Sequence, residues 1–230
     1  MKKIGIVGGT AWPSTVHYYT LICRQAEERF GVTPEFSIES LDLRLAVSLI
    51  GNDYDDRSWG AFDSYHREGL LRVSLSGCNV ACFAANTPHH RFEQITGGVP
   101  VHVVSIISSV AQAAIKHDCR KLLLLGTRLT MTSAFIRRTF SDAGVEVVLP
   151  SDEGQLAVID LIERLQQERC DNAGSEITRL TGGLPVILGC TELALAFPNA
   201  IGDCVFDYND SVFFNSLAIH AAAVLNLAAA

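Results

Sequence analysis

Four short segments of the chain place polar or reactive side chains directly after apolar, β-branched runs. They are Gly8-Gly9-Thr10, Asn86-Thr87-Pro88-His89, Gly126-Thr127 and Cys190-Thr191-Glu192. Glycines at such turns let the backbone approach a ligand closely, and the helix that follows begins with unpaired N–H groups that can bind an anion. Ligands of strand–helix proteins bind beyond the carboxyl ends of the strands, so these four turns are the candidate binding segments.

Cys190 is the side chain in these turns best suited to chemistry. A cysteine at a helix N-terminus has a thiolate stabilised by the helix dipole and free amides, which lowers its pKa. A thiol of lowered pKa is a candidate base or nucleophile. The alternative is a buried structural cysteine, which is the commoner role of a lone thiol.

The other turns also have two interpretations. Asn86 and Thr87 can donate hydrogen bonds to a carboxylate, but the same residue types are suited to capping a helix. The Gly9-Thr10 turn can cradle an anion, or it can serve only to reverse the chain. Its spacing is not GxGxxG, and no acidic residue follows about 20 residues on, which argues against a dinucleotide site.

Alternating strands and helices must position these turns. Apolar runs predict strands over residues 3–7, 36–41, 79–84, 101–104, 121–125, 145–149, 185–188 and 204–206. Amphipathic stretches predict helices over residues 14–30, 59–76, 107–117, 131–143 and 154–168. This alternation predicts an α/β fold with parallel sheets, whose right-handed crossovers bring the turns to one rim.

The pattern occurs twice. A strand ending in Gly-Thr is found at Gly9-Thr10 and again at Gly126-Thr127, and a strand ending in a small polar cluster is found in ACFAANTPH and again in PVILGCTEL. We therefore expect two pseudo-symmetric α/β domains that face each other across an active-site cleft. The first would contain residues 1–105 and 208–230, including a helix over residues 211–227, and the second residues 106–207.

Composition excludes several classes of partner. A net charge of −7 argues against nucleic acid or an anionic membrane as the main partner. No apolar run reaches the roughly 18 residues of a membrane span, and no signal-length apolar stretch begins the chain, so we expect a cytoplasmic protein. Seven cysteines without a CxxC motif argue against a disulfide framework and against a metal site.

Four motifs together resemble a known family. IGIVGGTAWPST, ANTPHH, LGTRLTM and GCTELAL are similar, in order and spacing across the whole chain, to the aspartate/glutamate racemase family. The resemblance extends in particular to the bacterial branch with L-aspartate/glutamate-specific racemases. It implies a dimeric, two-domain α/β enzyme with the active site between its domains and no pyridoxal phosphate or other cofactor. Its substrate would be aspartate, glutamate or a related small amino acid or dicarboxylate.

The resemblance also implies roles for individual residues. In the family, one thiolate removes the α-proton and a protonated thiol on the opposite face supplies another. By this match Cys190 is the second-half thiol, and Asn86, Thr87 and Thr191 hold the α-carboxylate of the substrate. The remaining residues of the implied substrate site are Gly9, Thr10, Thr127, Glu192 and Arg44. Arg44 is the candidate for a distal carboxylate, or else an exposed arginine at a helix start.

Two positions depart from the family pattern. Ala85 stands where the family has its first thiol, and a methyl group cannot accept or donate a proton. Cys82 lies three residues upstream and should face the opposite side of the strand, so reprotonation would need water or His89. Leu156 stands where many relatives have a lysine, which predicts a more apolar pocket.

Three functions remain open at this point. The first is racemase-type proton transfer at Cα of an amino acid, with Cys190 as the base. The second is single-thiol isomerase or lyase chemistry, because Ala85 leaves only one thiol. The third is binding of an amino acid without catalysis.

Overall fold

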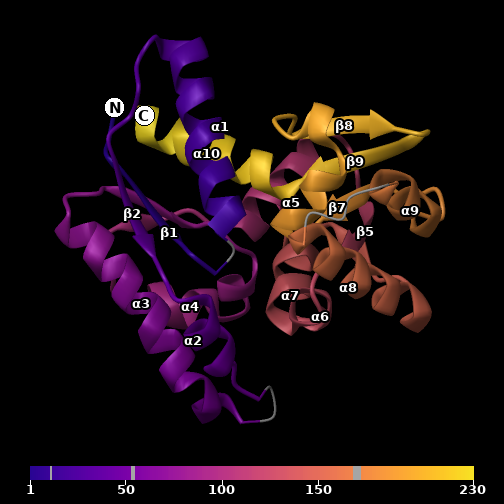
Figure 1. Cartoon of the computed structure of the whole chain (residues 1–230), viewed down its shortest axis with the longest axis horizontal. Coiled ribbons are helices and arrows are strands. Elements are labelled where there is room, and N and C mark those ends of the chain that lie inside the picture. Colours follow the sequence, from indigo (N-terminus) through magenta and orange to yellow (C-terminus); the bar gives the residue numbers. More distant parts are fainter. Residues whose placement is uncertain (11, 53–54, 168–171) are drawn as a thin grey trace. The chain divides into compact units, whose positions relative to one another are not determined.

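The computed structural model describes residues 1–10, 12–52, 55–167 and 172–230 (Figure 1). The chain forms two compact units, Met1–Ser105 with Ala221–Ala230, and Ile106–His220. Cys170 and the expected helix end at Glu168 lie outside the described residues. No helix within these ranges combines the length and the apolar content needed to cross a bilayer.

The first unit contains a four-stranded parallel sheet in the order β2-β1-β3-β4. Its strands are β1 (Ile4–Gly8), β2 (Phe36–Ser40), β3 (Val80–Phe83) and β4 (His102–Val103). Its helices are α1 (Trp12–Phe30), α2 (Leu43–Ser48), α3 (Gly60–Leu75) and α4 (Phe92–Thr96), with 3₁₀ helices at Asp56–Trp59 and Thr87–Arg91.

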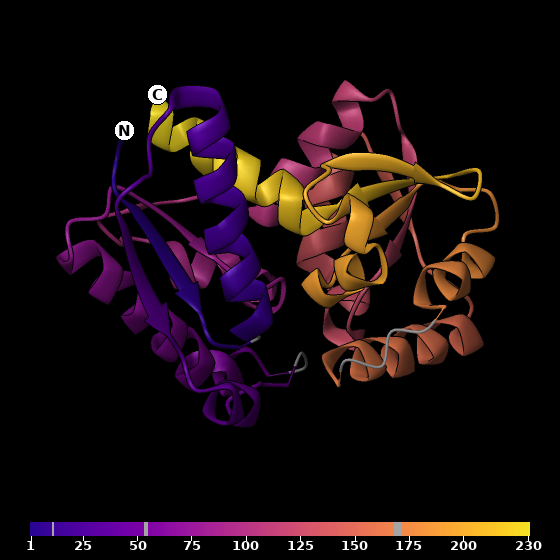
Figure 2. The ribbon, with the colours of Figure 1, turned by 45° about the horizontal axis from the view of Figure 1, so that its top comes forward.

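The central strands of this sheet are buried on both faces. Every residue of β1 and β3 is buried, which is why both sequences are almost continuously apolar. In Figures 1 and 2, α1 and α3 lie on opposite faces of the sheet. A Cβ on Gly69 of α3 would lie 2.8 Å from a methyl carbon of Val7 in β1, so glycine permits the close approach of this helix.

The second unit contains a five-stranded sheet in the order β6-β5-β7-β9-β8. Its strands are β5 (Lys121–Leu125), β6 (Glu146–Val148), β7 (Val186–Leu188), β8 (Val205–Tyr208) and β9 (Ser211–Asn215). Its helices are α5 (Ile106–Lys116), α6 (Arg128–Thr132), α7 (Ala134–Asp142), α8 (Asp152–Gln166) and α9 (Ala173–Leu180), with 3₁₀ helices at Thr191–Ala196 and Pro198–Ala200. All pairs are parallel except β8 with β9.

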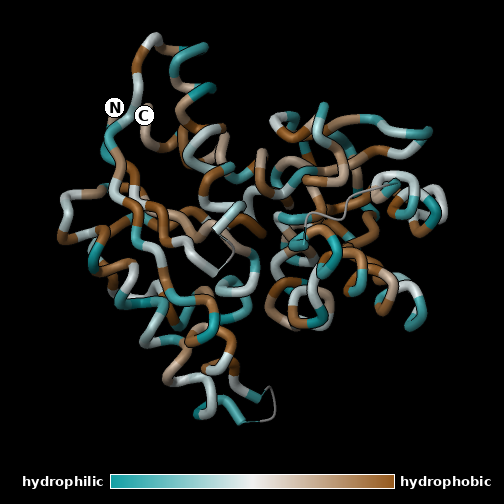
Figure 3. The backbone as a smooth tube through the Cα atoms, viewed as in Figure 1, coloured by the Kyte–Doolittle hydropathy of each residue, from teal (hydrophilic) through white to brown (hydrophobic). Residues whose placement is uncertain are grey.

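Two apolar layers cover this second sheet. One contains Leu123, Leu125, Val186 and Leu188 with the inner face of α8, and Cys190 belongs to it. The other contains Leu122, Leu124 and Ile187 with residues of α5 and α7. Brown and teal alternate along the helices in Figure 3, as expected of helices that bury one face against a sheet.

The two units repeat one topology. Strands β2-β1-β3-β4 and β6-β5-β7-β9 occupy the same order in their sheets and follow the same order along the chain. The predicted pseudo-symmetric α/β architecture is therefore observed, and β8 is an addition at the edge of the second sheet.

Three sequence-based expectations are corrected. The helix expected over residues 211–227 begins only at Ser216, as α10 (Ser216–Ala229), because Ser211–Asn215 forms β9 and pairs with β7. Asn209 and Asp210 make the preceding hairpin turn with positive φ angles, of 47° and 61°. Residues 208–220 therefore belong to the second unit and not to the first. The helix expected over residues 131–143 is divided into α6 and α7 at Ser133, which caps α7.

Candidate functional site

The turn after β1 depends on glycine. Gly9 has a φ of 87°, and a Cβ there would lie 2.1 Å from the carbonyl oxygen of Leu41. Its N–H donates a hydrogen bond to Oγ1 of Thr15, at 3.1 Å. The N–H of Gly9 is thus used within the turn itself, while the half-buried Thr10 follows at the same end of the sheet.

The turn after the neighbouring β3 contains Ala85 and Asn86, both buried. Asn86 precedes the 3₁₀ helix Thr87–Arg91, but its side chain makes no capping hydrogen bond to that helix. Capping therefore does not account for Asn86. Thr87, the next residue, is half-buried.

His89 packs against the turn after β3. Its ring is fully buried, with Nδ1 3.2 Å from the carbonyl oxygen of Ala85. The ring stacks on Phe92 with 5.1 Å between centroids, and its edge meets Phe83 at 5.9 Å. These contacts fix the backbone at Ala85 and leave the imidazole inside an aromatic cluster.

Arg91, which the sequence reasoning did not single out, anchors the same 3₁₀ helix. Its guanidinium pairs with Asp63 of α3 at 2.8 Å and also with Asp56. The Arg91 side chain is only 10% exposed. No short motif announces this pairing, because its partners are separated from it by 28 and 35 residues.

The surroundings of Arg44 and Cys82 differ from those of the residues in these turns. Arg44 is exposed in the first turn of α2, as in the alternative interpretation given to it above. Cys82 is fully buried within β3, and burial raises its pKa to about 12. Cys82 is therefore a poor replacement for a thiol at position 85, as its place in the strand predicts.

In the second unit, Thr127 follows β5 and caps α6. Its Oγ1 accepts a hydrogen bond from the N–H of Thr130, at 3.3 Å, and lies 3.0 Å from Oγ1 of that residue. The half-buried Thr127 thus shapes the turn beside β7.

The turn after β7 brings together a thiol and a carboxylate. Sγ of Cys190 donates a hydrogen bond to Oε2 of Glu192 at 2.9 Å, and Oγ1 of Thr191 donates to the same oxygen at 3.1 Å. Nε2 of Gln166, from the end of α8, lies 3.5 Å from Oε1 of Glu192. Cys190 and Glu192 are 7% and 4% exposed, so this carboxylate is held by donors in a nearly dry environment.

The pKa of Cys190 is shifted in the direction opposite to the one that the sequence predicts. Burial raises its pKa well above the ordinary thiol value, and the charge and hydrogen bond of Glu192 raise it further. The backbone N–H groups of Thr191 and Glu192 act in the lowering direction, but they are the smaller effect. The prediction of a lowered pKa was therefore wrong, and Cys190 is a protonated thiol at neutral pH.

Ala85 and Cys190 occupy equivalent positions in the two sheets. The residue before Ala85 donates its N–H to the carbonyl of Val7 in β1, at 2.9 Å. The residue before Cys190 donates its N–H to the carbonyl of Leu125 in β5, at 2.6 Å. Because β1 and β5 are themselves equivalent, the methyl group at 85 stands in one unit where the thiol stands in the other.

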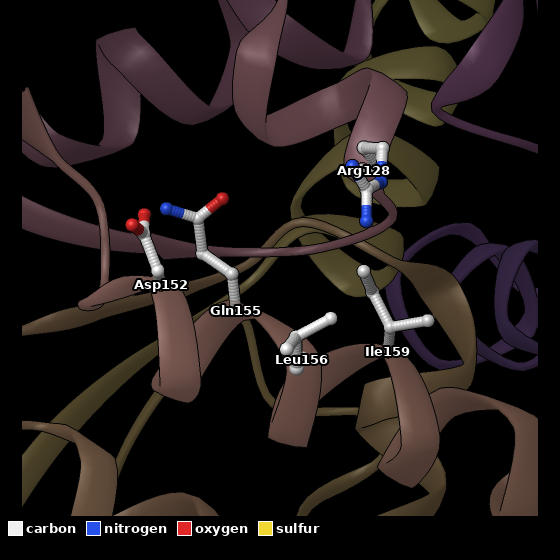
Figure 4. A pocket seen from close by; sticks show the side chains of 5 residues that line it. All are labelled: Arg128, Asp152, Gln155, Leu156 and Ile159. Atoms are coloured by element: carbon white, nitrogen blue, oxygen red, sulfur yellow. The ribbon is translucent and has the colours of Figure 1, made fainter.

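A hollow of about 210 Å³ lies in the second unit near the turn after β5 (Figure 4). Leu156, 59% exposed, lines it together with Arg128. The sequence predicts that Leu156 makes the pocket more apolar. In the structure the guanidinium of Arg128 lines the same hollow, so the hollow also contains a positive charge. Sequence reasoning had missed Arg128 as a candidate, although it stands within the LGTRLTM motif.

Comparisons with known proteins agree with these features. A family model described as Asp/Glu/hydantoin racemase matches residues 7–224. The chain is 28% identical over 168 residues to the broad specificity amino-acid racemase RacX of Bacillus subtilis (strain 168), and the alignment covers 71% of each chain.

Solved structures give the same result. A crystal structure of an aspartate racemase homologue from Pyrococcus horikoshii OT3 is 34% identical, with a TM-score of 0.82 and full coverage of both chains. The aspartate racemase of Picrophilus torridus shares the fold at 19% identity and a TM-score of 0.76, over 100% of this chain and 95% of that one. Since the family match runs through both units, the chain belongs to the Asp/Glu/hydantoin racemase family and is an enzyme of the racemase type.

Proposed function

We propose that this chain is a cofactor-independent amino-acid racemase in which Cys190 exchanges a proton with Cα of a small amino acid. The observation that carries the proposal is the buried hydrogen bond from Sγ of Cys190 to Glu192, at the carboxyl end of β7. Ligands of parallel α/β sheets bind at this end of the strands.

The raised pKa of Cys190 determines the order of proton movements. Before Sγ can take a proton from Cα, its own proton must leave, and Oε2 of Glu192 is the acceptor at 2.9 Å. The thiolate then removes the Cα proton, and the electron pair left on carbon delocalises into the α-carboxylate. In the reverse direction the protonated thiol donates directly to the carbanion. Glu192 is thus a positioning residue that acts through Cys190.

The α-carboxylate must be held while it carries the additional negative charge. We assign this to Asn86, Thr87 and Thr191, whose amide and hydroxyl groups can donate hydrogen bonds to it. The position of the buried Asn86 just beyond the carboxyl end of β3, where ligands of such sheets bind, supports this assignment.

Ala85 makes proton exchange one-sided. The methyl group at the position equivalent to Cys190 holds no proton, and His89 is enclosed by its aromatic neighbours. Water is then the second proton source. We expect exchange of the Cα proton with retention to be faster than conversion of one enantiomer into the other.

The test is deuterium incorporation at Cα from heavy water, followed by mass spectrometry for D- and L-amino acids offered separately. Cys190→Ser should lower the exchange rate by about 100-fold or more, since a positioned acid or base contributes 10²–10⁴. Cys119→Ser, at a half-buried thiol of the same unit, is the matched control and should keep the native rate. Native exchange in Cys190→Ser would refute Cys190 as the base.

Ala85 also favours a second candidate, single-thiol isomerase or lyase chemistry on a dicarboxylate-like acid. Products separate the two functions. A racemase gives the mirror image of its substrate, and a lyase releases ammonia. A homodimer in solution is part of the main proposal, and sedimentation analysis of the purified chain tests it.

A further inference from the structure

The hollow near the turn after β5 combines opposite charges with an apolar floor. Arg128 is the first residue of α6, and the other lining residues, Asp152, Gln155, Leu156 and Ile159, come from α8. In Figure 4, Asp152 and Gln155 lie at one side and Arg128 at the other, with Leu156 and Ile159 along the floor. The hollow therefore has a cationic and an anionic end.

Neither charged group is used within the part of the chain that the structure describes. The guanidinium of Arg128 and the carboxylate of Asp152 make no hydrogen bond or ion pair there, with each other or with another residue. Gln155 donates from Nε2 to the carbonyl of Pro150 at 3.1 Å, and its amide oxygen points into the hollow. Donor and acceptor groups are thus available at opposite ends.

The balance of charge determines which ligand fits. An acidic side chain would pair with Arg128 but would bring a second negative charge toward Asp152. A basic side chain would pair with Asp152 but would approach Arg128. A neutral group with an acceptor on one side and a donor on the other satisfies both ends. The volume of about 210 Å³ is many times the roughly 10–15 Å³ that one water needs, which is enough for a group of this kind.

We propose that this hollow binds the end of the substrate side chain and selects a net-neutral, dipolar group. Two chemical sources share this property, a carboxamide and a second amino-acid head that carries both ammonium and carboxylate. The proposal rests on the proposed function, because the hollow borders the turn after β5, the strand that pairs with β7 and its Cys190 turn. Leu156 and Ile159 would contact the methylene groups of the side chain.

Exchange at Cα measured on five amino acids tests the selection. These are glutamine, diaminopimelate, glutamate, lysine and norleucine. The native chain should give its highest kcat/KM with glutamine or diaminopimelate, and the better of the two identifies the source of the dipolar group. A native preference for glutamate, lysine or norleucine would overturn the proposal.

Single-charge variants sharpen this test. Asp152→Asn leaves only the cation of Arg128 in the hollow. The ratio of kcat/KM for glutamate to kcat/KM for glutamine should therefore rise by about two- to fivefold, the range of one exposed ion pair. Arg128→Met leaves only the carboxylate and should raise the ratio of lysine to glutamine by about the same factor. Glu153→Gln and Arg137→Met, exposed residues of the same unit outside the hollow, should change neither ratio.

Failure of the two proposals can be told apart. If Cα exchange occurs but neither ratio moves in the hollow variants, the hollow proposal is overturned and the racemase proposal stands. If no amino acid exchanges its Cα proton, the racemase proposal fails. The hollow proposal is then tested by calorimetry, as the ratio of glutamate to glutamine binding affinity in the native chain and in Asp152→Asn. An unchanged binding ratio would then overturn the hollow proposal as well.

Discussion

Two buried thiols of this chain differ in what they can do, and their surroundings explain why. Burial is the one cause that raises the pKa of Cys82, whereas Cys190 has the carboxylate of Glu192 as a proton acceptor 2.9 Å from Sγ. A thiol without an acceptor keeps its proton. At the scale of single residues, therefore, the role proposed for Cys190 depends on its partner Glu192 and not on a low pKa of the free thiol.

The inert thiol gives a prediction for stability at high pH. Cys82 keeps its proton in the folded chain up to about pH 12, while an unfolded thiol loses it near 9.0. The folded state then binds the extra proton, so the free energy of unfolding should fall by about 1.4 kcal/mol per pH unit in this window. Cys82→Ala should reduce that slope in urea unfolding measured between these pH values. An identical slope in the variant would contradict the assigned pKa.

Among the structural elements, the 3₁₀ helix Thr87–Arg91 is tied to α3 by an ion pair of Arg91. Arg91 ties it to Asp63 of α3, and both side chains are largely buried, at 10% and 16% exposed. Arg91→Met should therefore lower the free energy of unfolding by about 3 kcal/mol, because Asp63 is left without its counter-charge. Arg72→Met, which removes solvent-exposed pairs with Glu39 and Glu68, is the control and should lower the free energy of unfolding much less. Equal losses in urea denaturation would refute this role of Arg91.

The same elements show how far the sequence could predict the fold and the site. Strands such as β1 and β3 are buried on both faces, so their apolar runs were sufficient to locate them. The sequence predicts helix at strand β9 because its apolar run continues directly into α10, and its pairing with β7 is a long-range contact that periodicity cannot detect. The position of Cys190 was predictable from its motif. Its raised pKa was not, because it arises first from burial of the thiol and then from Glu192, which the 3₁₀ helix turns back onto Sγ.

At the scale of the whole molecule, the two units share one topology but carry different side chains at equivalent turns. The two sheets share the strand order β2-β1-β3-β4 and β6-β5-β7-β9, and the backbone at Ala85 is held as it is at Cys190. The backbone position for a second thiol is therefore present at Ala85, although Thr87 stands where Glu192 follows Cys190. The buried His89 and the ion-paired Arg91 keep this turn in place although it carries a methyl group.

Restoring a thiol at position 85 tests whether both halves act on one substrate. Ala85→Cys should raise the conversion of one enantiomer into the other by about 100-fold, because a positioned acid or base contributes 10²–10⁴. Ala85→Ser adds an atom of similar size with a much weaker acid, so it should keep the native rate once thermal unfolding shows that both variants fold. A folded Ala85→Cys variant with native inversion and unchanged enantiomer preference would mean that the turn after β3 and the turn after β7 do not meet at a common Cα.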